Sequence, residues 1–432
     1  MAQLHLATLD IHTRQLYATR GYAWEEWEHL REHAPVFWYE RPEIEPFWSI
    51  VRHRDVLEIS RRSDIFINGR RPRLNSRHDD ENEARFREVD LARRGWDANE
   101  VPDFVFMDDP RHKHFRSVAA RRFTPAALAK LEPHFAELSH QFARELAADL
   151  AETARSGGSI DFVRGFAQKL PLAAIGEMLG LPPGEWRRMK QLTNVMVGSA
   201  EPSYDRPGET RTERVSRAAT EMTDAMLEVV ADRQQCGRGA DLASQIVHAR
   251  VEGEPMNEQQ LQGYLFLILA AGNETTQNAI SGGAYALLQN PAQRELLERN
   301  PALLDGAVEE ILRWTSPVLQ FARTATQDYA LDGHEIRAGQ RVGLWYPAAN
   351  RDPGVFPNPY RFDITRAPNR HLAFGGYGAH FCLGANLARA ELRAALRALL
   401  PLLPRMEAAG PPEHAANLHV PAIHRLPVRA TA

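Results

Sequence analysis

Hydrophobic residues recur every three to four positions along much of the chain, the spacing of helices that bury one face. This pattern predicts helical stretches at residues 126–155, 162–180, 211–233, 257–290, 301–314 and 384–403. Strand-like runs are few and short, at residues 47–53, 321–326 and 340–346. We therefore expect a mainly α fold in which small β-sheets flank a helical body.

Two strongly polar stretches interrupt the pattern, at residues 69–103 and 198–212. Long polar connections in a compact domain often serve as lids over a site, so we interpret both as mobile connections, with plain solvated surface as the alternative. No low-complexity linker, repeat or break in composition divides the sequence. Residues 1–432 are thus expected to form a single domain.

The stretch 257–290 predicts the longest helix, about 50 Å at roughly 1.5 Å per residue. Asn257 and Gln260 are placed to cap its start, and the run "YLFLILAAG" is apolar on every face, which indicates burial. The polar sequence "GNETT", residues 272–276, then follows inside the same helix. A helix-interior glycine costs about 1 kcal/mol relative to alanine, and buried polar side chains need partners. This combination favours a functional groove over a purely structural helix.

Composition excludes several classes of function. The net charge of -4, from 52 basic and 56 acidic residues, leaves no footprint for nucleic-acid binding. No apolar run is long enough to span a membrane, and the first ten residues lack the basic start and apolar stretch of a secretory signal. The two cysteines cannot build a disulfide framework. We expect a cytoplasmic protein with reduced thiols.

Cys382 lies in the unusual sequence "AFGGYGAHFCLG", residues 373–384, whereas Cys236 is expected in a surface loop. The glycines permit close approaches, so the loop can lie flat against a bulky group. A helix predicted to start near Gly384 would favour the thiolate form of Cys382 through its unpaired amides and its dipole. A thiolate is a nucleophile or a metal ligand. A mixed zinc site with histidines stays open, and a single axial bond to haem iron needs only one cysteine.

The cysteine loop resembles the haem-ligand loop of the cytochrome P450 superfamily, Phe-Gly-x-Gly-x-His-x-Cys-x-Gly, with one additional residue between Phe374 and Cys382. Further stretches resemble motifs of that family in the right order: "DPRHKHFR" at 109–116, "AGNETT" at 271–276, "EEILR" at 309–313 and "FPNPYRF" at 356–362. Together the matches cover about residues 104–427. The chain is identified as a member of the superfamily. That membership implies the cytochrome P450 fold, with haem b (iron protoporphyrin IX) between the long central helix and the helix of the cysteine loop.

The resemblance implies how the chain would hold this haem. Cys382 would be the axial ligand of the iron, with Phe374 beside its sulfur, and Ala271 and Gly272 would leave room for dioxygen. The negatively charged propionates of the haem would be bound by basic residues, namely His112, Arg116, Arg323 and His380.

Two further groups of residues receive roles from the resemblance. Glu274 and Thr275 would be the acid–alcohol pair that relays protons towards dioxygen, and an ion pair with another helix is the alternative for Glu274. Glu310, Arg313 and Arg361 would form a structural triad that fixes the cysteine loop.

The resemblance also points to an apolar substrate pocket, which favours a lipophilic substrate. Its expected lining, for which ordinary core packing is the alternative, is Val105, Leu267, Ala270, Leu319, Phe321 and Val420. The later third of the chain is similar to family members that hydroxylate sterol side chains, branched lipids and terpenoids. Tailoring oxidation of a polyketide or another secondary metabolite is the alternative.

Electrons should come from a partner, because the chain has no Rossmann-type glycine fingerprint after a strand. We expect a ferredoxin and its reductase, with the ferredoxin docking on a basic patch formed by Lys113, Arg121, Arg122, Arg389 and Arg393. A non-catalytic haem-thiolate sensor would not need Glu274 and Thr275, and peroxygenases of the family lack such a pair. The sequence therefore predicts a monomeric, ferredoxin-dependent monooxygenase that inserts one oxygen atom of O2 into its substrate.

Overall fold

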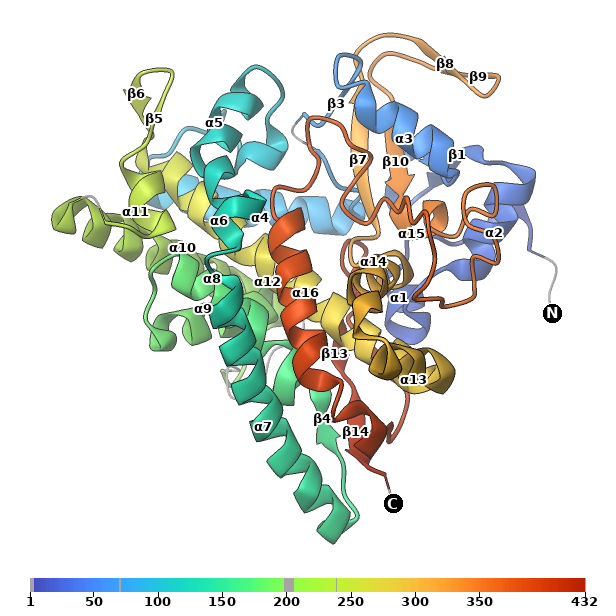
Figure 1. The fold of residues 1–432 in the computed structure, drawn as a ribbon. Helices are drawn as coiled ribbons and strands as arrows, with labels where there is room; N and C mark the ends of the chain where they lie inside the picture. The colour runs from blue at the N-terminus through green and yellow to red at the C-terminus, as the bar shows by residue number, and fades with distance from the viewer. Residues whose placement is uncertain (1–3, 70, 198–205, 238, 432) are drawn as a thin grey trace.

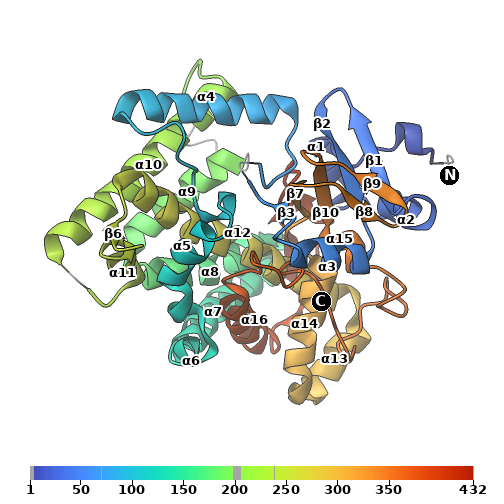
Figure 2. The ribbon, with the colours of Figure 1, turned by 90° about the horizontal axis from the view of Figure 1, so that it is seen from above.

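The computed structural model describes residues 4–69, 71–197, 206–237 and 239–431 (Figure 1). Helices make up most of the molecule, and a five-stranded sheet lies towards the N-terminal end, as Figures 1 and 2 both show. This arrangement confirms the prediction of a mainly α fold with small sheets at its flank. Among the described residues, no helix combines the length and apolar character that a membrane span requires.

All six predicted helical stretches correspond to helices of the structure, which has further helices outside them. In chain order they are α1 (Arg14–Arg20), α2 (Trp24–His33), α3 (His53–Arg61), α4 (Arg77–Arg94), α5 (Arg111–Ala120), α6 (Pro125–Leu128), α7 (Glu132–Ser156), α8 (Lys169–Met178), α9 (Pro183–Val197), α10 (Arg211–Cys236), α11 (Leu242–Val247), α12 (Glu258–Gln289), α13 (Pro291–Arg299), α14 (Leu304–Thr315), α15 (Tyr346–Ala349) and α16 (Ala385–Leu399). The periodic stretches of the sequence correspond to α6 with α7, α8, α10, α12, α14 and α16.

The larger sheet has the strand order β1 (Val36–Arg41), β2 (Ile44–Ile50), β10 (Arg341–Trp345), β7 (Gln320–Ala325) and β3 (Phe66–Ile67). Its three central strands are the three runs that the sequence predicts. The parallel pair β2 and β10 aligns Trp48 with Val342, and the antiparallel pair β10 and β7 aligns Val342 with Arg323. The register thus places Arg323 within the sheet.

The remaining strands form short ladders elsewhere in the chain. They are β4 (Ile160–Asp161), β5 (Arg250–Val251), β6 (Glu254–Pro255), β8 (Tyr329–Leu331), β9 (His334–Ile336), β11 (Met406–Ala408), β12 (Glu413–His414), β13 (Ile423–Arg425) and β14 (Pro427–Ala430). Strands β12 and β13 form a hairpin, and the chain between them reaches the larger sheet. There the carbonyl of His419 accepts from the amide of Leu319, directly before β7, at 2.9 Å.

Helix α12 crosses the molecule and packs against α8, α10, α14 and α16 (Figure 1). Its predicted start is confirmed. The amide of Gln260 donates to Asn257 Oδ1 at 2.9 Å, and the amide of Asn257 donates to Gln260 Oε1 at 3.0 Å. This reciprocal cap satisfies amides that a helix start leaves unpaired.

The prediction of a mobile connection over residues 69–103 is wrong for its central part, because Arg77–Arg94 form α4 (Figure 2). This helix has no buried residue, so hydrophobic spacing could not reveal it. Its ends supply the stabilisation instead: the Ser76 hydroxyl accepts from the amide of Asp79 at 3.1 Å, and Gly95 closes the C-terminus in the left-handed conformation. Helix α4 packs beside α10, where Arg94 forms an ion pair with Asp224.

The second polar stretch, residues 198–212, lies partly outside the described residues. Its last part begins α10, whose start is capped by Thr210: the Thr210 hydroxyl accepts from the amide of Glu213 at 3.3 Å. Cys236 is exposed and is the last residue of α10. The expectation that it lies in a surface loop is therefore wrong by one residue.

Candidate functional site

The cysteine loop runs between α3 and α16. The amide of Cys382 donates to the carbonyl of Phe374 at 3.0 Å, and Gly384 is the N-cap of α16, as the sequence predicts. A Cβ atom on Gly378 would lie 1.7 Å from the carbonyl oxygen of Ser60, the last but one residue of α3. This glycine therefore lets the loop press against α3, a contact with the protein itself rather than with a bound group.

The part of the cysteine loop that carries the additional residue includes an exposed aromatic side chain, Tyr377. Tyr377 has a positive φ of 60° and its ring stacks on that of Phe381 at 5.0 Å, directly before Cys382. The Phe374 ring lies under the guanidinium of Arg389, 4.6 Å from Cζ to the ring centre. The loop thus accommodates its extra residue at Tyr377 while Phe374 keeps its backbone contact with Cys382.

Opposing effects act on the pKa of Cys382. Its side chain is accessible to solvent, yet enough of the chain surrounds it that desolvation raises the pKa of the thiol. The amide of Gly384, Arg116 and Arg389 act in the opposite direction. The helix start thus favours the thiolate form of Cys382 as expected, but burial outweighs this effect on the thiol pKa in the chain by itself. A coordinated metal ion deprotonates a thiol outright.

The structure brings together the basic residues predicted to bind propionates. His112 and Arg116 lie on α5, Arg323 on β7 and His380 in the cysteine loop. The rings of His112 and His380 are 4.0 Å apart, and Arg116 Nη2 donates to the carbonyl of Phe381 at 2.5 Å. Burial, together with the positive charges of Arg323, His112 and Arg116, lowers the pKa of His380 to about 2. Among the described residues, buried His112 Nε2 has no hydrogen-bond partner.

This cluster fits a group that carries negative charge. The guanidiniums of Arg116 and Arg323 repel one another, and a carboxylate placed between them and the two imidazoles would accept from several donors at once. Within the described ranges, no three His, Cys, Asp or Glu side chains gather as metal ligands, which removes the mixed zinc site that the sequence left open. One accessible thiol beside a set of donors for carboxylates fits the iron and the propionates of haem.

One face of α12 borders the same region. Leu267 and Ala270 are partly accessible and Ala271 is exposed, although Leu265, Ile268 and Leu269 around them are buried. The prediction that this run is buried on every face is therefore wrong for the face that these three residues share. The Thr275 hydroxyl donates back to the carbonyl of Ala271 at 2.8 Å, one helical turn earlier.

Glu274 makes the contact that the sequence raised as an alternative to its role as an acid. Its Oε1 lies 3.9 Å from Nζ of Lys190 on α9, and the same ammonium donates to Oε1 of Gln277 at 3.1 Å. Burial raises the pKa of Glu274, and Lys190 opposes this shift. Burial also lowers the pKa of Lys190. The acid is therefore held by a buried ammonium whose own charge is disfavoured.

Lys190 is a residue that sequence reasoning missed. A signal was present, because Lys190 follows Trp186 by four positions and so lies on the face of α9 that packs into the core. A lysine there needs a partner.

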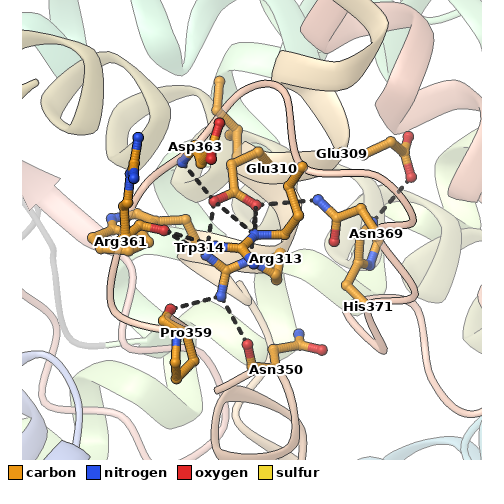
Figure 3. Close-up of polar contacts among 12 residues, drawn as sticks. Glu309, Glu310, Arg313, Trp314, Asn350, Pro359, Arg361, Asp363, Asn369 and His371 are labelled. Atoms are coloured by element: carbon orange, nitrogen blue, oxygen red, sulfur yellow. Dashed lines mark hydrogen bonds and ion pairs between the residues drawn. The ribbon is translucent and has the colours of Figure 1, made fainter. Parts of the chain in front are cut away.

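The structure brings together Glu310 and Arg313 of the predicted triad, but the Arg361 side chain does not join them, which corrects that part of the prediction (Figure 3). Glu310 and Arg313 form two hydrogen bonds of 2.7 Å with no exposed surface on either side chain. Arg361 contributes only its backbone carbonyl, which accepts from Arg313 Nη2 at 3.3 Å, and its side chain is exposed. The second guanidinium comes from Arg366, whose Nε donates to Glu310 Oε2 at 3.2 Å.

One segment rests directly on α12 before the expected pocket residue Val105. A Cβ on Gly263 would lie 1.8 Å from the carbonyl oxygen of Pro102, so this glycine allows that close approach. In the C-terminal segment the His419 ring packs edge-on against Phe321, another expected pocket residue, with 4.8 Å between ring centres.

The expected pocket residues differ in their exposure. Those that keep some accessible surface are Val105, Leu267, Ala270, Phe321 and Val420. Leu319 is fully buried in a separate cluster with Trp27 and Trp345, where core packing accounts for it.

Comparisons with known proteins show the family to which the chain belongs. A family model for Cytochrome P450 matches residues 188–402. The chain is 34% identical to a methyl-branched lipid omega-hydroxylase of Mycobacterium tuberculosis, over 92% of this chain and 89% of that protein. It is 33% identical to a steroid C26-monooxygenase of Mycolicibacterium smegmatis, over 90% and 86% of the two chains. A Mycobacterium marinum cytochrome P450 in complex with pseudoionone shares the fold with a TM-score of 0.84 at 30% identity, over 99% and 100%. The chain belongs to the cytochrome P450 family and is a haem-dependent monooxygenase.

Proposed function

We propose that this monooxygenase hydroxylates a lipophilic molecule of the steroid, methyl-branched lipid or terpenoid type, with electrons from a ferredoxin. The observation that carries the proposal is the similarity over nine tenths of the chain to two enzymes that act on such molecules. The apolar face of α12 at Leu267 and Ala270 supports it, since burial of hydrocarbon is what such a face offers.

In this proposal the chain positions the haem from both sides. Cys382 would bind its iron, and the cluster of His112, Arg116, Arg323 and His380 would hold its propionates. The bound haem supplies the activation of dioxygen, and the protein contributes orientation, exclusion of water and protons. His112 Nε2, which lacks a partner among the described residues, would gain one in this way.

Glu274 and Thr275 are proposed to deliver the protons. Burial raises the pKa of Glu274 towards the range in which a carboxyl both donates and regains protons at neutral pH. The Thr275 hydroxyl now donates to Ala271, and a rotation about its χ1 angle would release it towards the accessible face of α12. Lys190 would keep the Glu274 carboxylate in place between turnovers.

The proposed docking site for ferredoxin is narrower than the sequence suggests. Arg389 is engaged by Glu309 at 2.7 Å, Arg393 by Glu132 at 3.1 Å, and Arg122 by Gln245 at 2.9 Å. Exposed Lys113 and Arg121 remain as the charges we assign to an acidic partner. Reversal of both charges to Glu should slow reduction of the haem, measured by stopped-flow absorbance at low salt, and an unchanged rate would remove the docking site.

A ligand titration tests the proposed substrate class. Sterols, methyl-branched fatty acids, terpenoids and macrolides would be added to the purified ferric enzyme while its optical spectrum is followed. A saturable shift with sterols, branched lipids or terpenoids, followed by product formation with ferredoxin, its reductase and NADPH, is the expected result. A shift with macrolides alone would instead support secondary-metabolite tailoring, and binding without turnover would support a sensor. We also propose that the enzyme acts as a single-domain monomer in the cytoplasm, where both thiols stay reduced.

A further inference from the structure

A polar cluster lies among the segments that cover the proposed substrate pocket. We name it the Arg73 cluster, formed by the side chains of Arg73, Asp103 and His419. These residues are far apart in the sequence. Hydrogen bonds to β7 join the segments of Arg73 and His419, and Asp103 lies within electrostatic reach of Arg73. The amide of Ala322 donates to the carbonyl of Pro72 at 2.7 Å, and Gln320 Nε2 donates to the carbonyls of Leu74 at 3.1 Å and Leu418 at 3.4 Å.

Side-chain contacts bring the cluster to residues already assigned to the pocket. The Arg73 guanidinium lies over the Phe106 ring, 5.6 Å from Cζ to its centre, one residue after Val105. The His419 ring is edge-on to Phe321. The Arg73 cluster is thus a polar feature in a lining that is otherwise apolar.

His419 supplies a hydrogen-bonding atom without a partner. Its Nδ1 is buried and makes no hydrogen bond to any described residue. Burial and the neighbouring charge of Arg73 lower the pKa of His419 to about 3, against an opposing contact with the backbone of Gln320, so the imidazole is neutral at pH 7. A neutral imidazole offers one donor and one acceptor, and a buried polar atom of this kind is costly unless it is paired. A ligand oxygen would satisfy it.

The charge balance of the cluster decides which kind of oxygen fits. Arg73 Nη2 lies 3.4 Å from Glu83 on α4, and Asp103 is a second acidic neighbour whose Oδ1 accepts from the amide of Val105 at 2.7 Å. Burial raises the pKa of Asp103 to about 6, and Arg73 opposes this shift. One guanidinium therefore faces two carboxyl groups. A third negative charge from a fatty acid would meet repulsion, whereas a neutral hydroxyl would not.

We propose that the Arg73 cluster binds a hydroxyl group already present on the substrate, through His419 Nδ1 and the Arg73 guanidinium. A hydroxyl both donates and accepts, so it pairs with His419 Nδ1 in either tautomer. This inference rests on the proposed function and narrows it: the substrate is a hydroxylated lipophile, such as a sterol, rather than a free fatty acid.

The test compares ligands that share a skeleton in the purified ferric holoenzyme. Cholesterol would be titrated against cholestane, which lacks the hydroxyl, and phytanol against phytanic acid, with the spectral shift as the measure of Kd. We expect each alcohol to bind about tenfold more tightly than its partner, the equivalent of one buried hydrogen bond. Equal binding of cholesterol and cholestane, or tighter binding of the acid than of phytanol, would overturn the inference while leaving the proposed function intact.

Variants connect the preference to the cluster. His419→Phe keeps the ring against Phe321 and removes both nitrogens, so it should abolish the preference for alcohols without weakening cholestane. Arg73→Met should reduce that preference without the loss of an aromatic ring. His334→Phe, the same exchange at an exposed position of β9, is the matched control. If His419→Phe retains a normal carbon-monoxide spectrum and the full preference, the cluster does not bind the hydroxyl. If neither skeleton shifts the wild-type spectrum, the proposed function fails and this inference fails with it.

Discussion

The two sides of the proposed haem site differ in how completely their polar side chains are hydrogen-bonded. On the cysteine side, Glu310 and Arg313 have no exposed surface, and Glu310 also accepts from Arg366, Asn369 and the amide of Asp363 (Figure 3). On the substrate side, Glu274 has one ammonium at 3.9 Å and His419 Nδ1 has no partner among the described residues. Saturated hydrogen bonding fixes a geometry, whereas sparse bonding leaves groups free to change partners. The cysteine side is therefore expected to be rigid, whereas polar groups on the substrate side can change hydrogen-bond partners.

The largest effect should come from breaking the saturated side. Glu310→Ala leaves the buried Arg313 guanidinium without its carboxylate, and such a change costs about 3–5 kcal/mol. We expect a protein that contains little haem and has a lowered Tm. The ratio of haem to protein absorbance and a thermal unfolding curve measure both. Normal haem content with a wild-type Tm would show that the pair does not fix the cysteine loop.

A second pair of variants distinguishes the true partner of Glu310 from the predicted one. Arg366→Met removes hydrogen bonds to a buried carboxylate, with an expected loss of about 1.5–3 kcal/mol in the free energy of unfolding. Arg361→Met changes an exposed side chain and leaves the hydrogen-bonded backbone carbonyl of residue 361 in place. Its free energy of unfolding should therefore match wild type. Denaturant unfolding of the two variants gives the comparison, and equal losses would restore Arg361 to the triad.

On the sparse side the expected effect is on rate rather than stability. Glu274→Gln removes the proposed acid, and loss of a general acid typically slows turnover by about 10²–10⁴-fold. Haem content and Tm should stay unchanged. Product formation with ferredoxin and NADPH measures the effect, with Glu258→Gln in the first turn of α12 as the matched control. Wild-type turnover in Glu274→Gln would mean that Glu274 serves only its ion pair with Lys190.

Lys190→Met sharpens the same question through pH. The ammonium lowers the pKa of Glu274, so its removal should raise that pKa further. The limb of the pH–kcat profile that belongs to Glu274 should then move to higher pH. If the pH–kcat profile does not shift, or if it shifts equally in a Glu274→Gln background, Lys190 does not act on proton delivery through Glu274.

The smallest effect is expected at α4. Asp224→Asn removes the ion pairs that Arg93 and Arg94 make between α4 and α10, and exposed or half-buried pairs contribute about 0.2–1 kcal/mol each. Global stability should barely change, while amide hydrogen exchange in α4 should become faster. Unchanged exchange in α4 would show that its caps, rather than its ion pairs, hold it.

Much of the helical framework could be predicted because burial leaves a periodic trace in the sequence. Helix α12 is the strongest case, with its capping pair Asn257 and Gln260 and its apolar run. Helix α4 leaves no such trace, since it buries nothing and depends on Ser76 and Gly95 at its ends. Ser76 and Gly95 were visible in the sequence, but a capping residue indicates a helix end only where another signal already indicates a helix.

The site shows a similar division. Family motifs led to Cys382, His112 and His380, which the fold brings together from separate elements. The choice between Arg361 and Arg366 could not be made, because it depends on the direction in which a loop turns its side chains. Lys190 and His419 act through contacts with residues 84 and 98 positions away, Glu274 and Phe321, and no local pattern records such distances.

The contact between the cysteine loop and α3 has a consequence for protein engineering. At Gly376 an added Cβ would lie 2.4 Å from Cβ of Ser60, an atom that every residue except glycine carries, so variation there requires Ser60→Gly. At Gly378 the obstacle is the carbonyl oxygen of Ser60, which every amino acid carries. A library that varies the cysteine loop to tune its redox properties can therefore sample position 376 only with glycine at position 60, and it should leave position 378 constant.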